Sequence, residues 1–248
     1  MSDKRFSRTS MLLGKDKMQK LRDKKIMIIG MGAVGGYVLE GLSRAGINNF
    51  VLVDFDCFDE TNINRQILAT TETIGKKKVE VAKARVMSIN PQASVEIKDI
   101  FVNSKNISDL LSERPDMVID AIDALNPKCD LIEALCKHSI PFISSMGAAL
   151  KTDVSKIKYG NLSNSKNCSL AKFVRKRLRK RDIDISNIKC VWSEEQIILP
   201  ESALELPEEV SETGRTRHTL GSLPTITAIF GLMMANYVMN KLIKKLEK

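Results

Sequence analysis

A glycine-rich turn between a short apolar strand and a helix constrains the fold of this chain most strongly. Residues 26–29 form an apolar run short enough for a buried strand, and residues 50–53 form a second one. Between them a helical pattern runs from residue 34 to its end at Gly46. The turn itself has GxGxxG spacing, with Gly30, Gly32 and Gly35. This context predicts a βαβ unit in which backbone N–H groups and the helix N-terminus hold a phosphate.

Strand and helix patterns continue to alternate as far as Gly147. The expected elements are a helix from Thr73 to Asn90, a strand at 95–97, a short helix at 107–111, a strand at 117–123, a helix at 126–137 and a strand at 141–145. Such alternation predicts a Rossmann-like α/β fold with a mainly parallel sheet and flanking helices.

The pattern changes after Gly147, where we expect a mixed extension of the sheet. Its elements are a strand at 154–159, a basic helix at 168–181, a strand at 190–193 that continues at 197–199, a loop at 200–222 and a long helix at 225–245. The last helix is apolar nearly all round, which predicts burial against the sheet or a partner subunit. We expect one domain, 1–248, made of a helical arm at 1–24, a nucleotide-binding half at 25–147 and a substrate and dimerisation half at 148–248.

The net charge of +9 favours polyanionic partners. The helix at 168–181 carries much of this excess, and such a helix can be a solvated face, a membrane-surface helix or a polyanion contact. Its single Phe and its lack of Trp argue against a membrane, so we favour nucleic acid. The candidate contacts are Lys172, Arg175, Lys176, Arg179 and Lys180.

Cysteine usage and hydropathy argue against several classes of protein. The five cysteines include no CxxC pair, so the common zinc spacing is absent, and their odd number argues against a disulfide scaffold. The first residues lack the apolar core of a signal peptide. The longest apolar run, 226–239, is shorter than the ~20 residues of a membrane span. We therefore expect a cytoplasmic protein with reduced thiols and no membrane contact.

The segment from Asp54 to Ile67 is the most informative polar stretch. Asp54 closes a strand at the position where a ribose-binding acid usually lies. Arg65, with Asn62 and Gln66, offers donors suited to a phosphate. Asp123 closes a later strand, so we expect it at the same edge of the sheet as Asp54.

Three consecutive lysines, Lys76, Lys77 and Lys78, stand in the expected first turn of the helix that opens at Thr73. The helix dipole disfavours cations there, so we expect at least one lysine to reach a bound anion. A solvated lysine cluster is the plain alternative.

Together these motifs resemble the ubiquitin-activating-enzyme-like adenylyltransferases over nearly the whole chain. The matching stretches are Arg5–Arg8, Gly30–Gly36, Asp54–Asp56, Asn62–Gln66, Ile74–Gly75 with Lys78, and Asp120–Asp123. The resemblance implies that the turn of Gly30, Gly32, Ala33 and Gly35 holds ATP rather than a dinucleotide.

The resemblance also implies roles for single residues. Asp54 matches the acid that bonds the ribose, and Asp56 belongs to the same motif as a further ATP contact. The phosphate contacts match Asn62, Arg65, Gln66 and Lys78. Asp123 matches an acid that helps to hold Mg2+, and Arg8 matches an arginine that crosses a homodimer interface into the neighbouring ATP site. The expected catalytic residues are Arg65, Lys78 and Asp123.

Within the family, the chain departs from the activators of carrier proteins because it lacks two CxxC pairs and an appended domain, and because it has the basic segment at 172–181. It is most similar to a subgroup that acts on tRNA. The similarity lies in the strand that ends at Asp120–Asp123, the stretch Leu170–Leu178 and the opening of the last helix at 221–231. Such enzymes use ATP to activate the carboxylate of N6-threonylcarbamoyladenosine beside the anticodon as an acyl-adenylate, and they cyclise it with net loss of water.

Two other functions stay open. One is activation of the C-terminal glycine of a ubiquitin-like sulfur-carrier protein. The other is an NAD-dependent oxidoreductase or nucleotide-binding module, in which the polar loop at 62–66 and the lysines at 76–78 have no obvious use. A cysteine desulfurase or other sulfur-acceptor system stays open as a partner, in addition to tRNA and a second copy of the chain.

Overall fold

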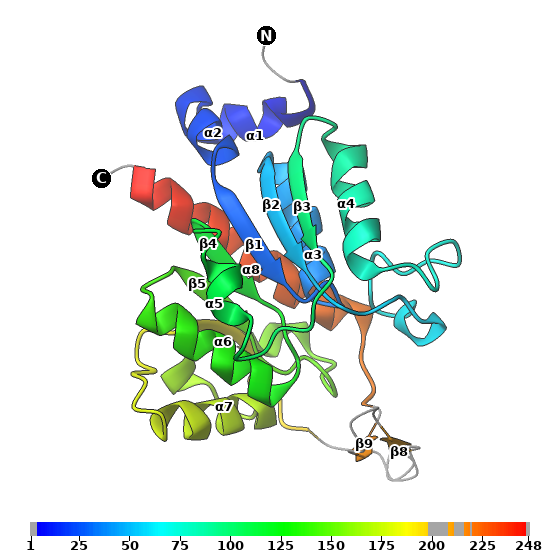
Figure 1. Cartoon of the computed structure of the whole chain (residues 1–248), viewed down its shortest axis with the longest axis vertical. Helices are drawn as coiled ribbons and strands as arrows, with labels where there is room; N and C mark the ends of the chain where they lie inside the picture. The colour runs from blue at the N-terminus through cyan, green and yellow to red at the C-terminus, as the bar shows by residue number, and fades with distance from the viewer. Residues whose placement is uncertain (1–3, 198–207, 211–215, 219, 247–248) are drawn as a thin grey trace.

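The computed structural model describes residues 4–197, 208–210, 216–218 and 220–246. Its centre is a seven-stranded sheet with the order β3-β2-β1-β4-β5-β7-β6 (Figure 1). The strands are β1 (Lys25–Ile29), β2 (Asn49–Val53), β3 (Ser94–Lys98), β4 (Met117–Asp120), β5 (Phe142–Ser145), β6 (Ile157–Asn161) and β7 (Lys189–Ser193). Neighbouring strands run parallel except for the edge strand β6, which pairs antiparallel with β7. The predicted fold class, a mainly parallel sheet with a mixed C-terminal extension, is confirmed.

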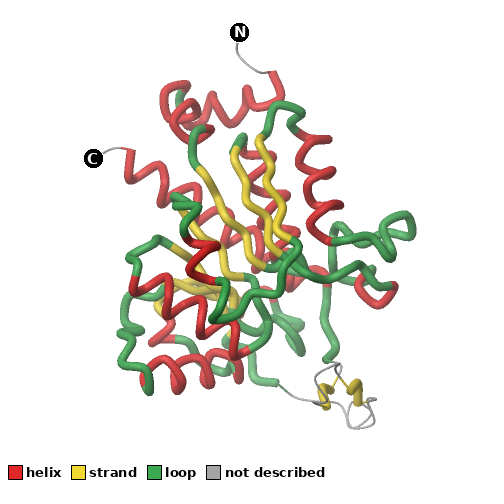
Figure 2. Tube along the Cα trace, in the orientation of Figure 1, coloured by secondary structure: helices red, strands yellow, loops and turns green. Residues whose placement is uncertain are grey.

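Helices cover both faces of this sheet (Figure 2). One face carries α3 (Gly35–Ala45), α4 (Lys78–Ile89) and α8 (Pro224–Leu246). The other face carries α5 (Ile107–Leu111) and α6 (Leu125–Lys137), and α7 (Ser169–Arg179) packs against α6. The molecule therefore has three layers, with the sheet in the middle.

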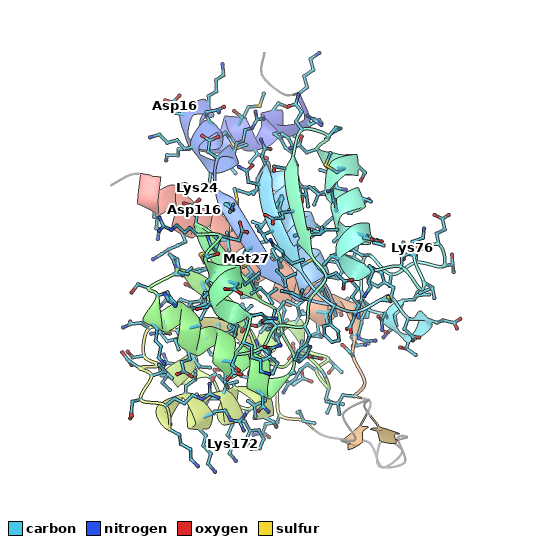
Figure 3. All side chains as sticks on the ribbon, in the orientation of Figure 1. Asp16, Lys24, Met27, Lys76, Asp116 and Lys172 are labelled. Atoms are coloured by element: carbon cyan, nitrogen blue, oxygen red, sulfur yellow. The ribbon has the colours of Figure 1, made fainter. Side chains whose placement is uncertain are left out.

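The central strand β1 is buried on both faces. Ile26 and Ile28 lie in the core beneath α3 and α8, whereas Met27 and Ile29 lie in the core beneath α5 and α6. Met27 accordingly lies deep in the molecule in Figure 3. A strand covered on both faces needs apolar residues at every position, so the sequence reads as a continuous apolar run.

The N-terminal arm consists of two helices, α1 (Ser7–Leu13) and α2 (Lys15–Arg22), which meet at Gly14. Because α2 leads directly into β1, the arm lies at the amino ends of the strands (Figure 1). Met18 and Leu21 anchor α2 in the core. In contrast, α1 exposes two large apolar side chains, Met11 (83%) and Leu12 (82%).

The second half differs in detail from the sequence prediction. Residues 154–156 form a 3-10 turn, so β6 begins only at Ile157, because Asp153 caps the turn by accepting the Ser155 backbone N–H. β7 ends at Ser193, and residues 194–197 do not continue it; the rest of the predicted strand at 198–199 lies outside the described residues. The predicted loop at 200–222 is also largely outside them. Its described parts include β8 (Glu208–Val210), which pairs antiparallel with β9 (Thr216–His218).

The long helix α8 packs as a core element. Within the part of the chain that the structure describes, it is the one helix long and apolar enough to cross a membrane, with a mean hydropathy of 1.3 over Pro224–Lys244. The predicted helix at 225–245 is thus confirmed to within one residue at each end, and its apolar stretch is longer than the run at 226–239. Ile226, Phe230 and Met234 are nevertheless fully buried in the core that α8 shares with α3 and the sheet.

Candidate active site

The glycine turn lies where the strand order reverses. β1 has β2 on one side and β4 on the other. In sheets of this kind ligands bind at such a switch point, in the crevice outside the carboxyl ends of the strands. Gly30 follows β1 with φ of +96°, and a methyl group there would lie 2.8 Å from the carbonyl oxygen of Ala121, just after β4. A methyl group at Gly35, the first residue of α3, would lie 1.8 Å from the carbonyl oxygen of Gly30. Glycine at both positions therefore lets the α3 N-terminus approach the two strand ends.

The open side of the turn is formed by Gly32 and Ala33, which are half-buried. A methyl group at Gly32 would have one neighbour within 4 Å, Nε2 of Gln66 at 3.9 Å. This leaves room for a ligand to approach the backbone N–H groups at the start of α3, which carry partial positive charge.

Asp54 fixes the turn from the end of β2. Its buried carboxylate accepts the backbone N–H of Met31 at 2.6 Å and that of Asp56 at 2.9 Å. Burial raises the pKa of Asp54, while the nearby Lys78 ammonium acts in the opposite direction. Asp54 therefore braces the glycine turn, and its role toward a ribose stays a prediction.

Lys78 is the first residue of α4, and it is buried. Its Nζ donates to Asp56 Oδ2 at 2.9 Å, and its backbone N–H donates to the Asp56 carbonyl at 3.0 Å. The segments 56–58 and 75–78 pair as a short bridge, which holds Lys78 beside the crevice. Asp56 is thus placed as the partner of Lys78.

The predicted helix start at Thr73 is wrong, because residues 73–77 form a turn whose Thr73 and Gly75 N–H groups bond within the loop. Lys77 precedes the helix and pairs with Asp99 at 3.0 Å. Lys76 extends into solvent at the outer loop in Figure 3. Only Lys78 therefore stands in the first helical turn, and of the three lysines it alone remains a candidate for the predicted anion contact.

The loop that carries Asn62 and Arg65 is held by its own hydrogen bonds. Asn62 takes part in a capping box with Asp59 at the 3-10 turn Glu60–Asn62. Arg65 Nη1 donates to the carbonyl oxygen of Thr61 at 2.7 Å and to Asn64 Oδ1 at 2.8 Å. Both side chains remain at the surface of the loop, so they can turn toward a ligand without breaking a buried contact.

Gln66 is the residue of this loop whose buried side chain lacks a hydrogen-bond partner among the described residues. Its side chain is buried beside Gly32, yet Oε1 has no hydrogen-bond partner among the described residues. A buried unsatisfied oxygen costs about 1–3 kcal/mol. A donor from a ligand or from ordered water in the crevice would remove this cost.

Asp123 is exposed and lies in the loop after β4. The predicted strand at 117–123 is therefore too long. It ends at Asp120, whose Oδ1 accepts the backbone N–H of Ile122 at 3.1 Å and turns the chain out of the sheet.

A buried cluster next to Asp123 was not predicted from the sequence. Lys128 Nζ lies 2.6 Å from Asp120 Oδ2, and both side chains are fully buried. The hydroxyl of Ser144 donates to the same carboxylate oxygen at 2.6 Å. The cluster joins β4, β5 and α6 and fixes the root of the loop that carries Asp123. A signal for it existed, because Lys128 shares a helix face with the apolar Leu131, Ile132 and Leu135 at spacings of three, four and seven.

The donor set around Asp123 suits Mg2+ only together with a ligand. Among the described residues, no group of three His, Cys, Asp or Glu side chains could hold a metal ion. Mg2+ commonly binds through one or two carboxylates together with substrate phosphates and water. A single exposed carboxylate at the edge of a phosphate-binding crevice fits that pattern.

The predicted tRNA contacts are not equivalent. Lys172, Lys176 and Arg179 are exposed on α7, and Lys180 is exposed at its C-cap. Lys172 extends away from the body of the protein in Figure 3. Arg175 instead donates to the carbonyl oxygen of Ser165 at 2.7 Å and to its hydroxyl, so it fixes the approach to α7. Arg8 is exposed on α1, at the amino edge of the sheet and opposite the glycine turn (Figure 1).

The fold and the crevice define a nucleotide-binding protein of the doubly wound α/β class. The chain belongs to the ThiF family, whose model matches residues 6–248.

Its relatives resemble it over nearly the full length. It is 37% identical to the tRNA threonylcarbamoyladenosine dehydratase of Haemophilus influenzae, with 98% of this chain and 95% of the relative covered. It is 32% identical to the enzyme of that name from Bacillus subtilis, with 98% and 96% covered. Among solved structures, it resembles the Escherichia coli tRNA N6-threonylcarbamoyladenosine dehydratase TcdA in complex with ATP, with a TM-score of 0.87, 30% identity, and 98% and 95% of the two chains covered.

Proposed function

We propose that this protein uses ATP to dehydrate and cyclise N6-threonylcarbamoyladenosine beside the anticodon of tRNA, through an acyl-adenylate. The observation that carries the proposal is the convergence at one sheet edge of a phosphate-binding turn, a buried lysine and the unpartnered Oε1 of Gln66. Relatives that match nearly the whole chain bear the name of this activity, and the similar solved structure is a complex with ATP.

The first step of the reaction activates the carboxylate of the substrate. A carboxylate is a poor electrophile, because oxide would have to leave. Attack of a carboxylate oxygen on the α-phosphorus of ATP forms an acyl-adenylate and releases pyrophosphate. The ureido nitrogen of the same substrate then attacks the acyl carbon, loses its proton and expels AMP. The substrate oxygen lost as water thus leaves on AMP, and the protein supplies no nucleophile.

The chain's own residues bind ATP and stabilise charge in this scheme. The turn of Gly30, Gly32, Ala33 and Gly35 holds the phosphates with Asn62 and Gln66, while Asp54 receives the ribose. Lys78 and Arg65 neutralise charge at the α-phosphate and the departing pyrophosphate. A preorganised donor of this kind typically contributes ~10²–10³ in rate.

Asp123 would hold Mg2+ together with phosphate oxygens. When bound there, the ion withdraws charge from the phosphates. The buried Asp120–Lys128 pair keeps the loop of Asp123 in place.

The cysteines do not suggest a covalent intermediate. Cys129, Cys168 and Cys190 are buried, and burial raises the pKa of Cys190 to about 12, far from the thiolate form. Cys136 is half-buried and Cys57 is exposed, and a sulfur-acceptor partner stays outside the proposal.

A homodimer forms part of the proposal. Arg8 lies at the edge of the sheet opposite its own glycine turn, and the neighbouring Met11 and Leu12 are exposed. A second copy that covers α1 would bury these side chains and bring Arg8 to the other copy's ATP site. In this arrangement, residues 25–147 bind the nucleotide, and residues 148–248 bind the substrate and contribute to the dimer interface. The enzyme acts on tRNA in the cytoplasm.

The direct test is mass analysis of nucleosides from tRNA that has been incubated with the protein and ATP. We expect threonylcarbamoyladenosine to be replaced by a nucleoside lighter by one water, only when ATP is present. In the same assay Lys78→Ala should lower the rate about 10²–10³-fold. Lys76→Ala is the matched control, since Lys76 is exposed two residues away, and it should keep the wild-type rate.

The rival functions give other results. Adenylation of a carrier protein's C-terminal glycine, with no change in tRNA, would favour the carrier-protein activator. Tight binding of NAD without binding of ATP would favour an oxidoreductase. Equal rates for Lys78→Ala and Lys76→Ala would contradict the role given to Lys78.

A further inference from the structure

An aromatic ring stands uncovered on the outer face of the basic helix. Phe173 of α7 is 52% exposed. The apolar face of the helix is formed by Ala171, Val174 and Leu178, which are buried against α6 and β7. Phe173 lies outside this stripe, and the structure gives it no ring or cation contact among the described residues. Packing against the described residues therefore does not account for an aromatic residue here.

Cations surround this ring. By helical spacing, Lys176 and Lys180 follow Phe173 at i+3 and i+7, and so they share its face. Lys172 precedes it directly, and Arg179 follows at i+6, so both lie on one neighbouring side of the helix. In the described part of the chain, no carboxylate pairs with any of these four cations. An apolar partner would have to desolvate these charges, whereas a polyanion would neutralise them.

The other three arginines of the segment have structural partners. Arg175 donates to Ser165, Arg177 Nη1 donates to Asn126 Oδ1, and Arg181 Nη1 lies 2.7 Å from both Asp130 Oδ1 and Glu133 Oε2. These contacts fasten α7 to α6 and to the loop before it. They leave the face of Phe173 as the free basic surface, which we define as Lys172, Phe173, Lys176, Arg179 and Lys180.

This surface is fastened to the root of the active-site loop. Asn126, the partner of Arg177, lies in the first turn of α6, three residues after Asp123. Arg177 follows Phe173 at i+4 and therefore lies beside it on the helix. A strand of RNA that lies along the surface would have a base near the ring and its neighbours near the crevice.

We propose that Phe173 stacks on an unpaired base of the tRNA anticodon loop, while the surrounding lysines and Arg179 contact the phosphates. The inference rests on the proposed function and adds the form of RNA that is recognised. Proteins that bind single-stranded RNA combine a basic track with aromatic side chains, because unstacked bases offer a free face. A double helix offers no such face, so the preferred ligand is a loop.

The test compares Phe173→Ala and Lys176→Gln, with Phe173→Trp as the rescue variant, for binding to an anticodon stem-loop over a range of salt concentrations. Phe173→Ala should weaken binding about 5- to 100-fold, as expected for the loss of one stacked base, and leave the salt dependence unchanged. Phe173→Trp should restore binding. Lys176→Gln, the matched charge variant on the same face, should weaken binding and lower the salt slope by about 0.7–0.9. A fully paired duplex of the same length should bind wild type and Phe173→Ala alike.

Three outcomes separate the two proposals. Stem-loop binding by Phe173→Ala within about twofold of wild type, with Lys176→Gln weakened, overturns the stacking role and leaves the proposed function intact. A change in the molecular mass of Phe173→Ala in solution also overturns it, because the ring would then be a contact between copies. If tRNA affinity is unchanged in both variants and no tRNA nucleoside is altered, the proposed function itself fails. Thermal unfolding of each variant confirms that the fold is retained.

Discussion

At the scale of single residues, the crevice depends on charges that are buried and paired. Asp54 Oδ2 accepts the Met31 N–H of the glycine turn, Asp54 Oδ1 accepts the N–H of Asp56, and Lys78 is held by Asp56. Lys128 and Asp120 form a fully buried pair behind the loop of Asp123. Removing one member of a buried pair leaves an unpaired charge in a medium that solvates it poorly, so the protein loses stability. An exposed pair contributes little to the free energy of unfolding, so its removal costs little.

We therefore expect Lys128→Met to destabilise the protein by about 3–5 kcal/mol in urea unfolding. The matched control is Lys137→Met on the same helix, where the exposed lysine pairs with Glu133 and the loss should be at most about 1 kcal/mol. Adding Asp120→Asn to Lys128→Met should recover part of the stability, because it neutralises the stranded carboxylate. Equal stability of the two single variants would contradict the account of the buried pair.

At the scale of elements, two helices approach each other at glycines. A methyl group at Gly231 of α8 would lie 2.6 Å from Cβ of Tyr37 and 2.7 Å from the carbonyl oxygen of Val34. A methyl group at Gly41 of α3 would lie 3.0 Å from Cβ of Ala235. This close contact holds α8 over the helix that begins at the glycine turn.

Gly231→Ala should therefore cost about 1–3 kcal/mol of stability through overpacking, even though alanine is the better helix former. Gly221→Ala is the control, since a methyl group there would have no neighbour within 4 Å, and we expect a change within about 0.5 kcal/mol. Thermal unfolding of both variants measures the difference. A Gly231→Ala protein as stable as wild type would show that α8 can move away from α3 without cost.

The elements that could be predicted from the sequence are those in which local pattern and burial agree. β1 and β2 are apolar at nearly every position because both faces are covered, and Gly30 and Gly35 stand where no side chain fits. The same reasoning placed α6, α7 and α8 within a few residues. Such signals are local, so one sequence is enough to read them.

The features that could not be predicted depend on contacts between distant segments. The pairing of 56–58 with 75–78 delays the start of α4 to Lys78. The end of β4 is a local exception, because the backbone N–H of Ile122 bonds to the side chain of Asp120 two residues earlier and ends the strand before Asp123. Lys128 was not singled out from the sequence, because its partner, Asp120, belongs to another element. The partners of three arginines likewise lie outside α7. Arg175 bonds to Ser165, Arg177 to Asn126, and Arg181 to Asp130.

At the scale of the whole molecule, three surfaces serve one proposed reaction. The crevice at the β1–β4 switch point would bind ATP, α7 would present the RNA, and α1 would contact a second copy. The arm is separated from its own crevice by the length of β1, whose five residues span roughly 17 Å. Arg8 therefore has a use at an ATP site only if that site belongs to the partner subunit.

Mixing two inactive variants tests this arrangement. Arg8→Ala and Lys78→Ala homodimers should each have greatly reduced activity, because every site lacks one cation. After subunit exchange, a mixed dimer has one site with Lys78 from its own chain and Arg8 from the other, and a second site that lacks both. Random exchange at equal amounts should restore about a quarter of the wild-type sites, with the ATP-dependent change in tRNA nucleosides as the readout.

Mixing Lys78→Ala with a Lys78→Ala, Arg8→Ala double variant is the control, and it should stay inactive because no site regains Lys78. If exchange is confirmed by mass and activity does not rise, Arg8 acts within its own subunit or has no catalytic role.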